Sequence, residues 1–493
     1  MRPGRNSRKC HFWEASIIPG MARHTRLVHL PLDTTDLSAR AIAGQLVALI
    51  AAGQVGDGAW LPSTRALAHE LGASRTMVAA AYEELVAAGF LEGMPGAGTR
   101  TTVGATAAAK AGLSSRAPRL DDTGPAPAAH GTRRSTDNLV DLRPGSPDTG
   151  LIDMRAWTRA WRAAASTPPT ALSPWQDTDD AFTAAMSHHL RVSRGIDTDT
   201  VLDVPGSTAA FQALAAVSGL TRCYLESPCY PAAAEEFARA GLHPVFVPVD
   251  HDGLCVDRLG EEAGIVYTTP AHQYPLGHRL SVNRRAELVA WANRTGSLVI
   301  EDDYDGEFRY GVAPLPAIRS IPGAEEHVAY VGTASKILAS SLGAAWLVPP
   351  APLRDVTQTY LRDHRIAVST ITRDALTALI TGGELQRHLA RASREYRCRR
   401  DILITELEAR CPDLDVLGVQ AGLHVAILLP GDHRDRDVAA ALEADGLIVA
   451  PLSTFPQQPG FEINGIAVNF AQINRSTARR FTDGVAGALQ SRA

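Results

Sequence analysis

The stretch "VAYVGTASKILASSLGAAWLV", residues 328–348, is the most informative part of the chain, because it places a lysine among apolar residues. Lysine occurs only three times in 493 residues, as Lys9, Lys110 and Lys336. Arginine can serve any surface role of a positive charge, but it does not readily lose a proton and form an imine with an aldehyde. Lys336 follows a strand-like run and is flanked by Thr333 and Ser335, so it is a candidate Schiff-base lysine for pyridoxal phosphate (PLP). The alternative is an ordinary surface lysine, and the rest of the chain must decide.

The length and composition of the chain indicate a water-soluble protein of more than one domain. The length of 493 residues exceeds that of a usual single domain, and a hydrophobic fraction of 45% with a charged fraction of 20% is ordinary. No apolar run approaches the roughly 18 residues of a membrane span. The basic start lacks the apolar core of a secretion signal, and translation could begin at Met1 or at Met21. The six scattered cysteines form no CxxC pair, so we expect reduced thiols, no metal site and a cytoplasmic location.

The net charge of −5 hides an asymmetry along the chain. Residues 1–138 carry 15 basic and 11 acidic side chains, whereas the remainder carries 33 basic and 42 acidic side chains. A mildly basic N-terminal part on an acidic body is typical of a polyanion-binding module joined to a metabolite-binding domain.

Residues 36–102 are expected to form one small unit of three helices and a hairpin. Apolar residues at helical spacing, serine caps and terminal glycines predict the helices. They are expected over residues 38–51, in "LPSTRALAHELG" from Ser63 or Thr64 to Gly72, and in "ASRTMVAAAYEELVAAG" from Ser74. The stretch "FLEGMPGAGTRTTV" predicts two short strands around a Pro-Gly turn. Three helices, a tight turn and a hairpin describe a winged helix-turn-helix.

Beyond this unit the composition changes twice. We expect an N-terminal extension over residues 1–35, and a flexible linker over the Ala-, Gly-, Ser-, Thr- and Pro-rich residues 103–138. In residues 139–493 short β runs alternate with helical stretches, which predicts a mainly parallel α/β sheet. The pattern becomes more helical later, so we expect a large lobe to about residue 365 and a small α+β lobe over residues 366–493.

In the N-terminal unit, polar and basic residues fall where a reading helix needs them. The first turns of the third helix should enter the major groove, where arginine binds guanine bidentately. The start of the second helix suits a phosphate, and the wing tip should lie near the backbone or minor groove. The candidate DNA-binding residues are Ser63, Thr64, Arg65, Ser74, Arg75, Thr76, Thr99 and Arg100. The alternative is a winged helix used for protein contacts.

The stretch "LPSTRALAHELGASRTMVAAAYEELVAAGFLEGMPGAGT" resembles the GntR superfamily of bacterial regulators nearly end to end. That resemblance implies binding to double-stranded DNA. Because a dimer presents two winged helices, the operator is expected to contain two half-sites.

The C-terminal part holds a second set of polar segments. "VIEDDYDGEFRY" places Asp302 and Tyr304 at the end of a strand, where ligands bind in parallel sheets. An aspartate there can keep a pyridine nitrogen protonated, which makes the ring an electron sink. "PGSTAAFQAL" opens a helix with Ser207 and Thr208, a ready anion site. "ESPCYPAAA" offers Tyr230 for ring stacking, and "TPAHQYPLG" offers His272 and Gln273. Taken singly, these segments are also typical of an acidic loop, a helix cap, a core tyrosine and a polar loop.

The order of these segments resembles the fold-type I aminotransferases, and the whole layout resembles the MocR branch of the GntR superfamily over residues 36–102 and 139–493. In that family the domain binds PLP as an internal aldimine and senses an amino compound or PLP itself, usually as a head-to-tail homodimer. The resemblance implies that Lys336 forms the aldimine, Asp302 faces the pyridine nitrogen, Tyr304 the ring hydroxyl and Tyr230 the ring face. The full set of implied cofactor residues is Lys336, Asp302, Tyr304, Tyr230, Ser207, Thr208, Thr333 and Gln273.

Two positions depart from the family pattern. Gly343 stands seven residues after Lys336, where the family commonly has an arginine that binds the cofactor phosphate. Ala467 stands where a late strand commonly carries an arginine that clamps a substrate carboxylate. Each loss removes a charge-assisted contact worth about 1.5–3 kcal/mol. PLP binding should weaken unless another arginine, such as Arg373, substitutes.

Three functions remain open from the sequence. The first is a PLP-dependent transcriptional regulator that senses its effector at the aldimine, without catalysing amino-group transfer. The second is a working aminotransferase with a fused DNA-binding unit, against which the missing carboxylate arginine counts. The third is an aminotransferase fold that no longer holds PLP and serves as a dimerisation or ligand scaffold.

Overall fold

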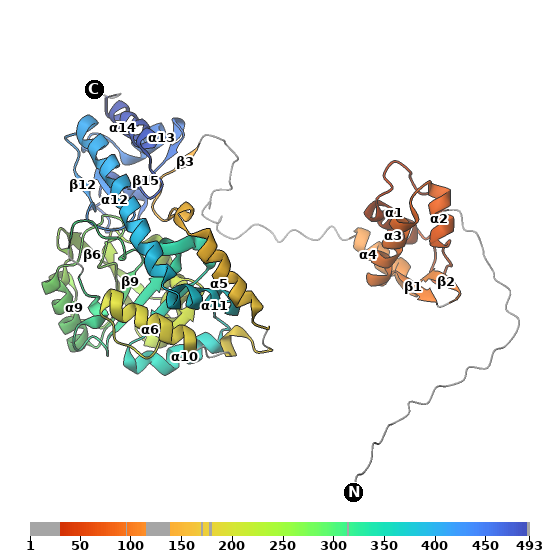
Figure 1. Ribbon diagram of the computed structural model, residues 1–493, viewed down its shortest axis with the longest axis horizontal. Coiled ribbons are helices and arrows are strands. Elements are labelled where there is room, and N and C mark those ends of the chain that lie inside the picture. Colours follow the sequence, from red (N-terminus) through yellow and green to blue (C-terminus); the bar gives the residue numbers. More distant parts are fainter. Residues whose placement is uncertain are drawn as a thin grey trace, which may run out of the picture. The chain divides into compact units, whose positions relative to one another are not determined.

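The computed structural model describes residues 30–94, 96–114, 139–168, 171–176, 180–312 and 315–490. The chain divides into two compact units, Met1–Arg134 and Ser135–Ala493 (Figure 1). The first 29 residues, with the choice of start codon, and the expected linker from residue 115 to residue 138 lie outside the described residues.

The first unit is a winged helix-turn-helix, as expected. Its helices are α1 (Ala39–Ala51), α2 (Thr64–Leu71) and α3 (Arg75–Ala87), and its wing is the antiparallel pair β1 (Leu91–Met94) and β2 (Gly98–Thr101). The hydroxyl oxygens of Ser38, Ser63 and Ser74 accept backbone N–H bonds at the three helix starts. These caps satisfy donors that have no partner within a helix, so the serine spacing sets the helix boundaries.

The core of this unit comes from the apolar stripes seen in the sequence. Ile42, Leu67, Val78 and Leu85 are buried together. Tyr82 is buried as well, and its hydroxyl donates to the Pro62 carbonyl at 2.9 Å. The third helix is therefore held by its inner face, and its first turn is left free on the outside.

A fourth helix, α4 (Ala105–Ser114), occupies the beginning of the segment expected to be a flexible linker. Ala105 and Ala109 are 2% and 1% exposed and belong to the core against α1. The Asp57 carboxylate accepts from the Gly104 and Thr106 backbone N–H groups. The linker boundary at residue 103 was therefore wrong, because an Ala-rich segment gives little periodicity in sequence but packs closely once a partner helix is present. Leu30, inside the expected extension, is buried in the same core.

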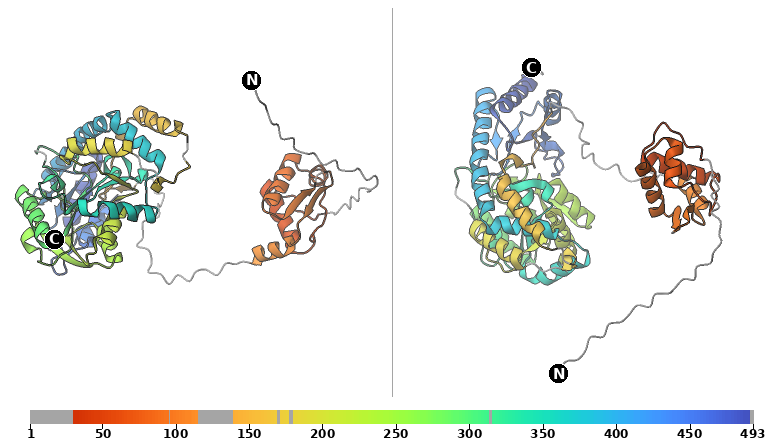
Figure 2. Two further views of the ribbon diagram at one scale, coloured as in Figure 1. Left: turned by 90° about the horizontal axis from the view of Figure 1, so that it is seen from below. Right: turned by 45° about the vertical axis from the view of Figure 1, so that its right-hand side comes forward.

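The second unit is built on an eight-stranded sheet in the order β4-β11-β10-β9-β8-β5-β6-β7. Figure 2 shows the ribbon of this unit from two further directions. The strands are β4 (Leu202–Val204), β5 (Arg222–Ser227), β6 (His243–Asp250), β7 (Gly253–Leu254), β8 (Ile265–Thr268), β9 (Leu298–Asp303), β10 (Val328–Thr333) and β11 (Ala345–Val348). The pairs from β10 through β9, β8 and β5 to β6 are parallel. β11 runs antiparallel to both neighbours, and β7 runs antiparallel to β6. The expected mainly parallel sheet is confirmed.

Helices cover both faces of the sheet. α7 (Ser207–Ser218), α8 (Pro231–Arg239) and α10 (Arg354–Asp363) share one core with the sheet. α6 (Asp180–Arg194), α9 (Val282–Thr295) and α11 (Thr370–Thr381) contribute to the cores on the other face, where α11 also packs on α5 (Met154–Ser166). Val331 and Leu347 point to the first face, and Tyr330 and Trp346 to the second, as strand alternation requires.

The smaller lobe consists of the four-stranded sheet β12-β13-β16-β15 with α12, α13 and α14. The elements are β12 (Val416–Leu417), β13 (His424–Leu428), β15 (Ala450–Pro451), β16 (Gly465–Asn469), α12 (Glu384–Arg410), α13 (Asp435–Ala444) and α14 (Arg475–Gln490). β3 (Val140–Asp141), from the start of this unit, pairs with β14 (Leu447–Ile448). A single division at residue 365 therefore does not describe the lobes. Among the described residues, no helix has both the length and the apolar character to cross a membrane.

Candidate cofactor cavity and DNA-binding face

A cavity of about 290 Å³ opens where β8, β9 and β10 reach their carboxyl ends. It is lined by seven of the eight residues predicted to bind the cofactor: Ser207, Thr208, Tyr230, Asp302, Tyr304, Thr333 and Lys336. The parallel strands explain this convergence, since their carboxyl ends meet at one edge of the sheet.

Gln273, the eighth predicted residue, lies behind the cavity. Its side-chain amide donates to the Pro228 and Tyr274 carbonyls at 2.8 and 2.9 Å, and its oxygen accepts from the Leu276 backbone N–H at 3.1 Å. Gln273 therefore holds the turn together, and the neighbouring Tyr274 lines the cavity instead.

Four further lining residues were missed in the sequence: Pro144, Gly145, Tyr267 and Thr269. Tyr267 and Thr269 lie at the end of a predicted strand, and the same edge rule would have found them. Gly145 comes from a distant part of the chain, and no pattern in the sequence indicated its position.

Lys336 enters the cavity from the turn Ser335–Ala339, which directly follows β10. Its Nζ donates to the Gly145 carbonyl at 2.6 Å. Burial lowers the pKa of the Lys336 amine, and the Asp305 and Asp302 carboxylates only partly oppose this. A lower pKa makes the neutral, nucleophilic amine more available, which an imine-forming lysine needs.

Asp302 lies on β9 and is only 3% exposed. Tyr267 donates its hydroxyl to Oδ2 at 2.7 Å, while Oδ1 has no hydrogen-bond partner in the described part of the chain. Burial raises the pKa of the Asp302 carboxyl from its usual 3.8 to about 7. A buried carboxylate oxygen without a donor is costly, so this atom suits the N–H of a protonated pyridine ring.

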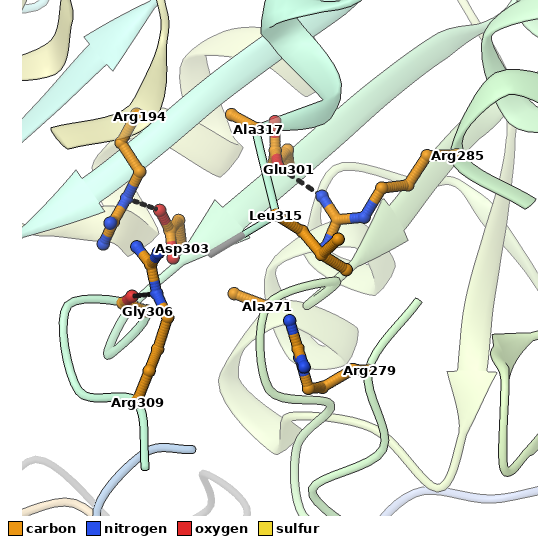
Figure 3. A pocket seen from close by; sticks show the side chains of 10 residues that line it. All are labelled: Arg194, Ala271, Arg279, Arg285, Glu301, Asp303, Gly306, Arg309, Leu315 and Ala317. Atoms are coloured by element: carbon orange, nitrogen blue, oxygen red, sulfur yellow. Dashed lines mark hydrogen bonds and ion pairs between the residues drawn. The ribbon is translucent and has the colours of Figure 1, made fainter. Parts of the chain in front are cut away.

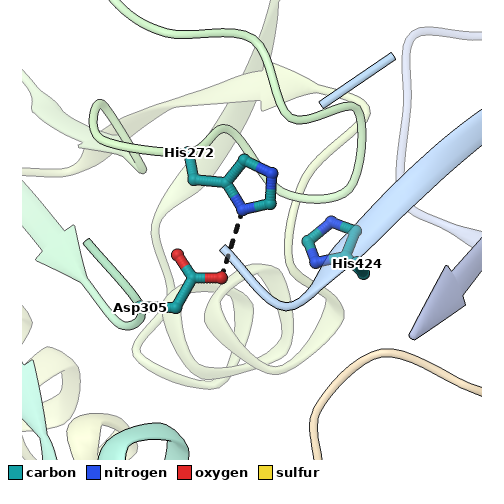
Figure 4. A group of neighbouring side chains, drawn as sticks. All are labelled: His272, Asp305 and His424. Atoms are coloured by element: carbon teal, nitrogen blue, oxygen red, sulfur yellow. Dashed lines mark hydrogen bonds and ion pairs between the residues drawn. The ribbon is translucent and has the colours of Figure 1, made fainter. Parts of the chain in front are cut away.

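Behind Tyr304 lies a buried group formed by His272, Asp305 and His424 (Figure 4). Tyr304 donates its hydroxyl to the His272 carbonyl at 2.7 Å, and His272 Nδ1 lies 3.1 Å from Asp305 Oδ2. His424 Nε2 lies 3.1 Å from the Pro275 carbonyl. Ligand atoms of the three residues lie within 4.8 Å of one another, which is a metal-like spacing that the sequence did not predict.

This group is closely packed against the loop before β13. Gly422 has a φ of 72°, and a Cβ there would lie 2.0 Å from His272 Nδ1. The Leu423 backbone N–H also donates to Asp305 at 3.3 Å. Since His424 belongs to β13 and Asp305 follows β9, the group joins the smaller lobe to the main sheet directly behind Tyr304.

In the first unit, the predicted DNA-binding residues fall into two groups. Ser63, Arg65, Ser74, Arg75 and Thr76 are exposed, at the starts of α2 and α3. Thr64, Thr99 and Arg100 are half-buried. Arg100 donates to Glu92 at 2.7 Å and lies over the Trp60 ring at 5.8 Å, so its guanidinium is held against the wing.

Comparison with known proteins agrees with both units. The model for aminotransferase class I and II matches residues 137–481, and the model for bacterial regulatory proteins of the gntR family matches residues 38–101. The pyridoxine biosynthesis transcriptional regulator PdxR of Corynebacterium glutamicum is 32% identical over 91% of this chain and 95% of its own length. The probable rhizopine catabolism regulatory protein MocR of Rhizobium meliloti is 29% identical over 89% and 91%.

The chain belongs to the MocR-type regulators of the GntR family. Solved aminotransferases share the fold of its larger unit. The multiple substrate aminotransferase of Thermococcus profundus has a TM-score of 0.65 at 22% identity, covering 72% of this chain and 93% of that one. The kynurenine aminotransferase of Pyrococcus horikoshii has a TM-score of 0.66 at 21% identity, covering 72% and 93%.

Hydroxyls and backbone surround the start of α7 in the cavity of this MocR-type chain. Ser207, Thr208, Thr333 and Ser335 line the cavity, and α7 begins there without a side-chain cap. The free N–H groups of a helix start attract an anion. Among the described lining residues there is no arginine.

Among the described residues, neither expected arginine is replaced from elsewhere in the chain. Gly343 adopts the left-handed conformation with φ 54°. Arg373 is buried on α11, with its guanidinium 4.0 Å from the Asp203 carboxylate, and does not line the cavity. Ala467 is fully buried in an apolar cluster with Leu276 and Phe455. The regulator therefore lacks, in its described residues, both positive charges that the family pattern places there.

Strand alternation sends the neighbours of Asp302 to the opposite side of β9, into an arginine-rich pocket (Figure 3). There Arg194 is ion-paired with Asp303 and, at 2.9 Å, with Glu307. Arg285 lies 3.7 Å from Glu301 and donates to three backbone carbonyls. These buried charges are matched within the protein, so of the three acids on this strand Asp302 alone serves the cavity.

Replacing Asp302 by Asn is expected to stabilise the protein without added cofactor, and increasingly so from about pH 4 to pH 7. The raised pKa means that the folded state holds a proton that the unfolded state releases, so wild-type stability contributed by this group is lost as the pH rises to about 7. Each pKa unit corresponds to about 1.4 kcal/mol. Thermal unfolding across this pH range measures the difference. The exposed Asp257→Asn should follow the wild type, and a pH-independent effect of Asp302→Asn would contradict the assignment.

Proposed function

We propose that this DNA-binding regulator binds PLP in the cavity and that occupancy of the cavity alters its hold on an operator. The observation that carries the proposal is that Lys336 and Asp302 line one cavity, and that Asp302 Oδ1 has no hydrogen-bond partner among the described residues. PLP, when bound, supplies an aldehyde and an electron-withdrawing ring. Lys336 would bond to the aldehyde, Asp302 would hold the pyridine N–H, and Tyr230 would lie against the ring.

The phosphate would be held by the start of α7 with the hydroxyls of Ser207, Thr208 and Thr333. A site without arginine loses a charge-assisted contact of about 1.5–3 kcal/mol, or about 10- to 150-fold in affinity. PLP is thus expected to bind this protein reversibly and to exchange with free PLP in the cell. Reversible binding suits a protein that senses PLP itself, and its relative PdxR is named for pyridoxine biosynthesis.

The effector is PLP or an amino compound that reacts with it, and catalysis of amino-group transfer is not part of the proposal. A transaminated amino acid needs a partner for its carboxylate, and Ala467 is a fully buried apolar residue that provides none. Ala467 and Gly343 together support an alternative function, in which the fold has lost PLP and serves as a scaffold.

A homodimer, head-to-tail as in the family, would present two winged helices to two half-sites in the cytoplasm. Ser63, Thr64 and Arg65 would contact phosphates, Arg75 a guanine, and the wing with Thr99 and Arg100 the backbone or minor groove. Operator binding would be coupled to PLP binding if two conformational states of the dimer differ in their affinity for PLP.

Adding PLP to the purified protein should produce a violet-region absorption band that borohydride bleaches. The Lys336→Ala variant should lack the band and remain folded, because the side chain donates only one hydrogen bond, to Gly145. Lys110→Ala, at an exposed position of α4, is the matched control and should keep it. If the wild type shows no band at any PLP concentration, the scaffold function takes precedence.

Gly343→Arg is expected to tighten PLP binding about tenfold. An added Cβ at this position would meet only the Pro205 carbonyl, at 3.6 Å, beside the start of α7. The left-handed backbone costs a side chain about 1 kcal/mol, which a charge-assisted phosphate contact exceeds. Gly343→Ala bears the same backbone strain without the charge. Equal PLP dissociation constants for the two variants, measured by absorbance titration, would show that the phosphate lies elsewhere.

Arg75→Ala is expected to weaken specific operator binding by about 5- to 150-fold, since a bidentate guanine contact is worth about 1–3 kcal/mol. Its PLP spectrum should not change. Arg40→Ala, exposed on α1, is the control that also removes one positive charge. Mobility-shift titrations at one salt concentration measure the effect, and equal affinities of wild type and Arg75→Ala would refute the role of Arg75.

A further inference from the structure

An exposed methionine stands at the beginning of the reading helix. Met77 lies in the first turn of α3, directly after Arg75 and Thr76, and is 46% exposed. Val78 and Tyr82 hold the helix from its inner face. The Met77 side chain therefore contributes little to the core. It lies beside the polar residues that are proposed to face DNA.

The rest of α3 limits how much of the helix can lie in a groove. Ala80 is exposed one turn after Met77, and residues three apart are neighbours on a helix surface. Glu83 and Glu84 follow, both exposed, and their carboxylates would repel phosphates. Base contact from α3 is thus confined to about its first two turns, where Met77 is the one exposed large apolar side chain.

The major groove presents one apolar group, the C5-methyl of thymine. We propose that Met77 reads a thymine methyl in each half-site, next to the guanine assigned to Arg75. The proposal rests on the DNA-binding role of α3 proposed above, and it adds the class of base that this helix selects. Ala80, being small, leaves the groove floor open to the methionine.

The test uses the full chain and a duplex obtained by in vitro selection from random sequence. Each thymine of that duplex is replaced in turn by deoxyuridine, which removes only the methyl group. Burying one methyl group corresponds to about a fourfold change in affinity. We expect one thymine position per half-site at which uracil weakens wild-type binding by about three- to fivefold, and all other positions to be neutral.

Met77→Ala should bind thymine and uracil duplexes equally at that position, whereas Met77→Leu should keep part of the difference. Met94→Ala is the matched control, because Met94 is 39% exposed but lies on the wing strand β1. A uracil effect that persists in Met77→Ala, or no uracil effect in the wild type, overturns the proposal. Selection that recovers no specific duplex, or one whose binding is indifferent to Arg75→Ala, would instead refute the DNA-binding role of α3.

Discussion

The cavity depends on the burial of a carboxyl group, Asp302, at the end of β9. Its Oδ2 is satisfied by Tyr267 from the neighbouring strand, and its Oδ1 has no partner among the described residues. Since an unpaired buried carboxylate is costly, the folded protein favours either a proton or a ligand N–H at this atom. Lys336, from the turn that follows β10 on the other side of β9, completes the site. The register of three parallel strands thus places an acid and an amine where one planar ring can reach both.

The remaining walls of the cavity support the proposal of sensing without catalysis. Enzymes of this fold must retain their cofactor and orient a substrate, and both tasks favour fixed positive charges. Here the described cavity lining offers a helix start and hydroxyls but no arginine, and position 467 is apolar. Weaker retention is an advantage for a protein whose occupancy should follow ligand concentration, because a permanently filled site reports nothing.

A physical route from the cavity to the rest of the unit is present in the group behind Tyr304. Tyr304 bonds to His272, His272 to Asp305, and Asp305 to the backbone at Leu423 next to β13 of the smaller lobe. A ligand that draws the Tyr304 hydroxyl toward itself would change the hydrogen bonding of His272. The smaller lobe is therefore connected by hydrogen bonds, and not only by packing, to the wall of the cavity.

The sequence by itself determined the winged helix, the order of strands and helices, and seven residues of the cavity. These follow from local rules, because serine caps, apolar periodicity and the carboxyl ends of strands act within a few residues. The tertiary structure alone decided that α4 is not linker, that Gln273 supports a turn while Tyr274 lines the cavity, and that Gly145 meets Lys336. It also decided that the two acids next to Asp302, Glu301 and Asp303, pair with arginines on the opposite side of β9. Each of these depends on which distant segment packs alongside, or on which face of the sheet a side chain points to. A local sequence pattern contains neither kind of information.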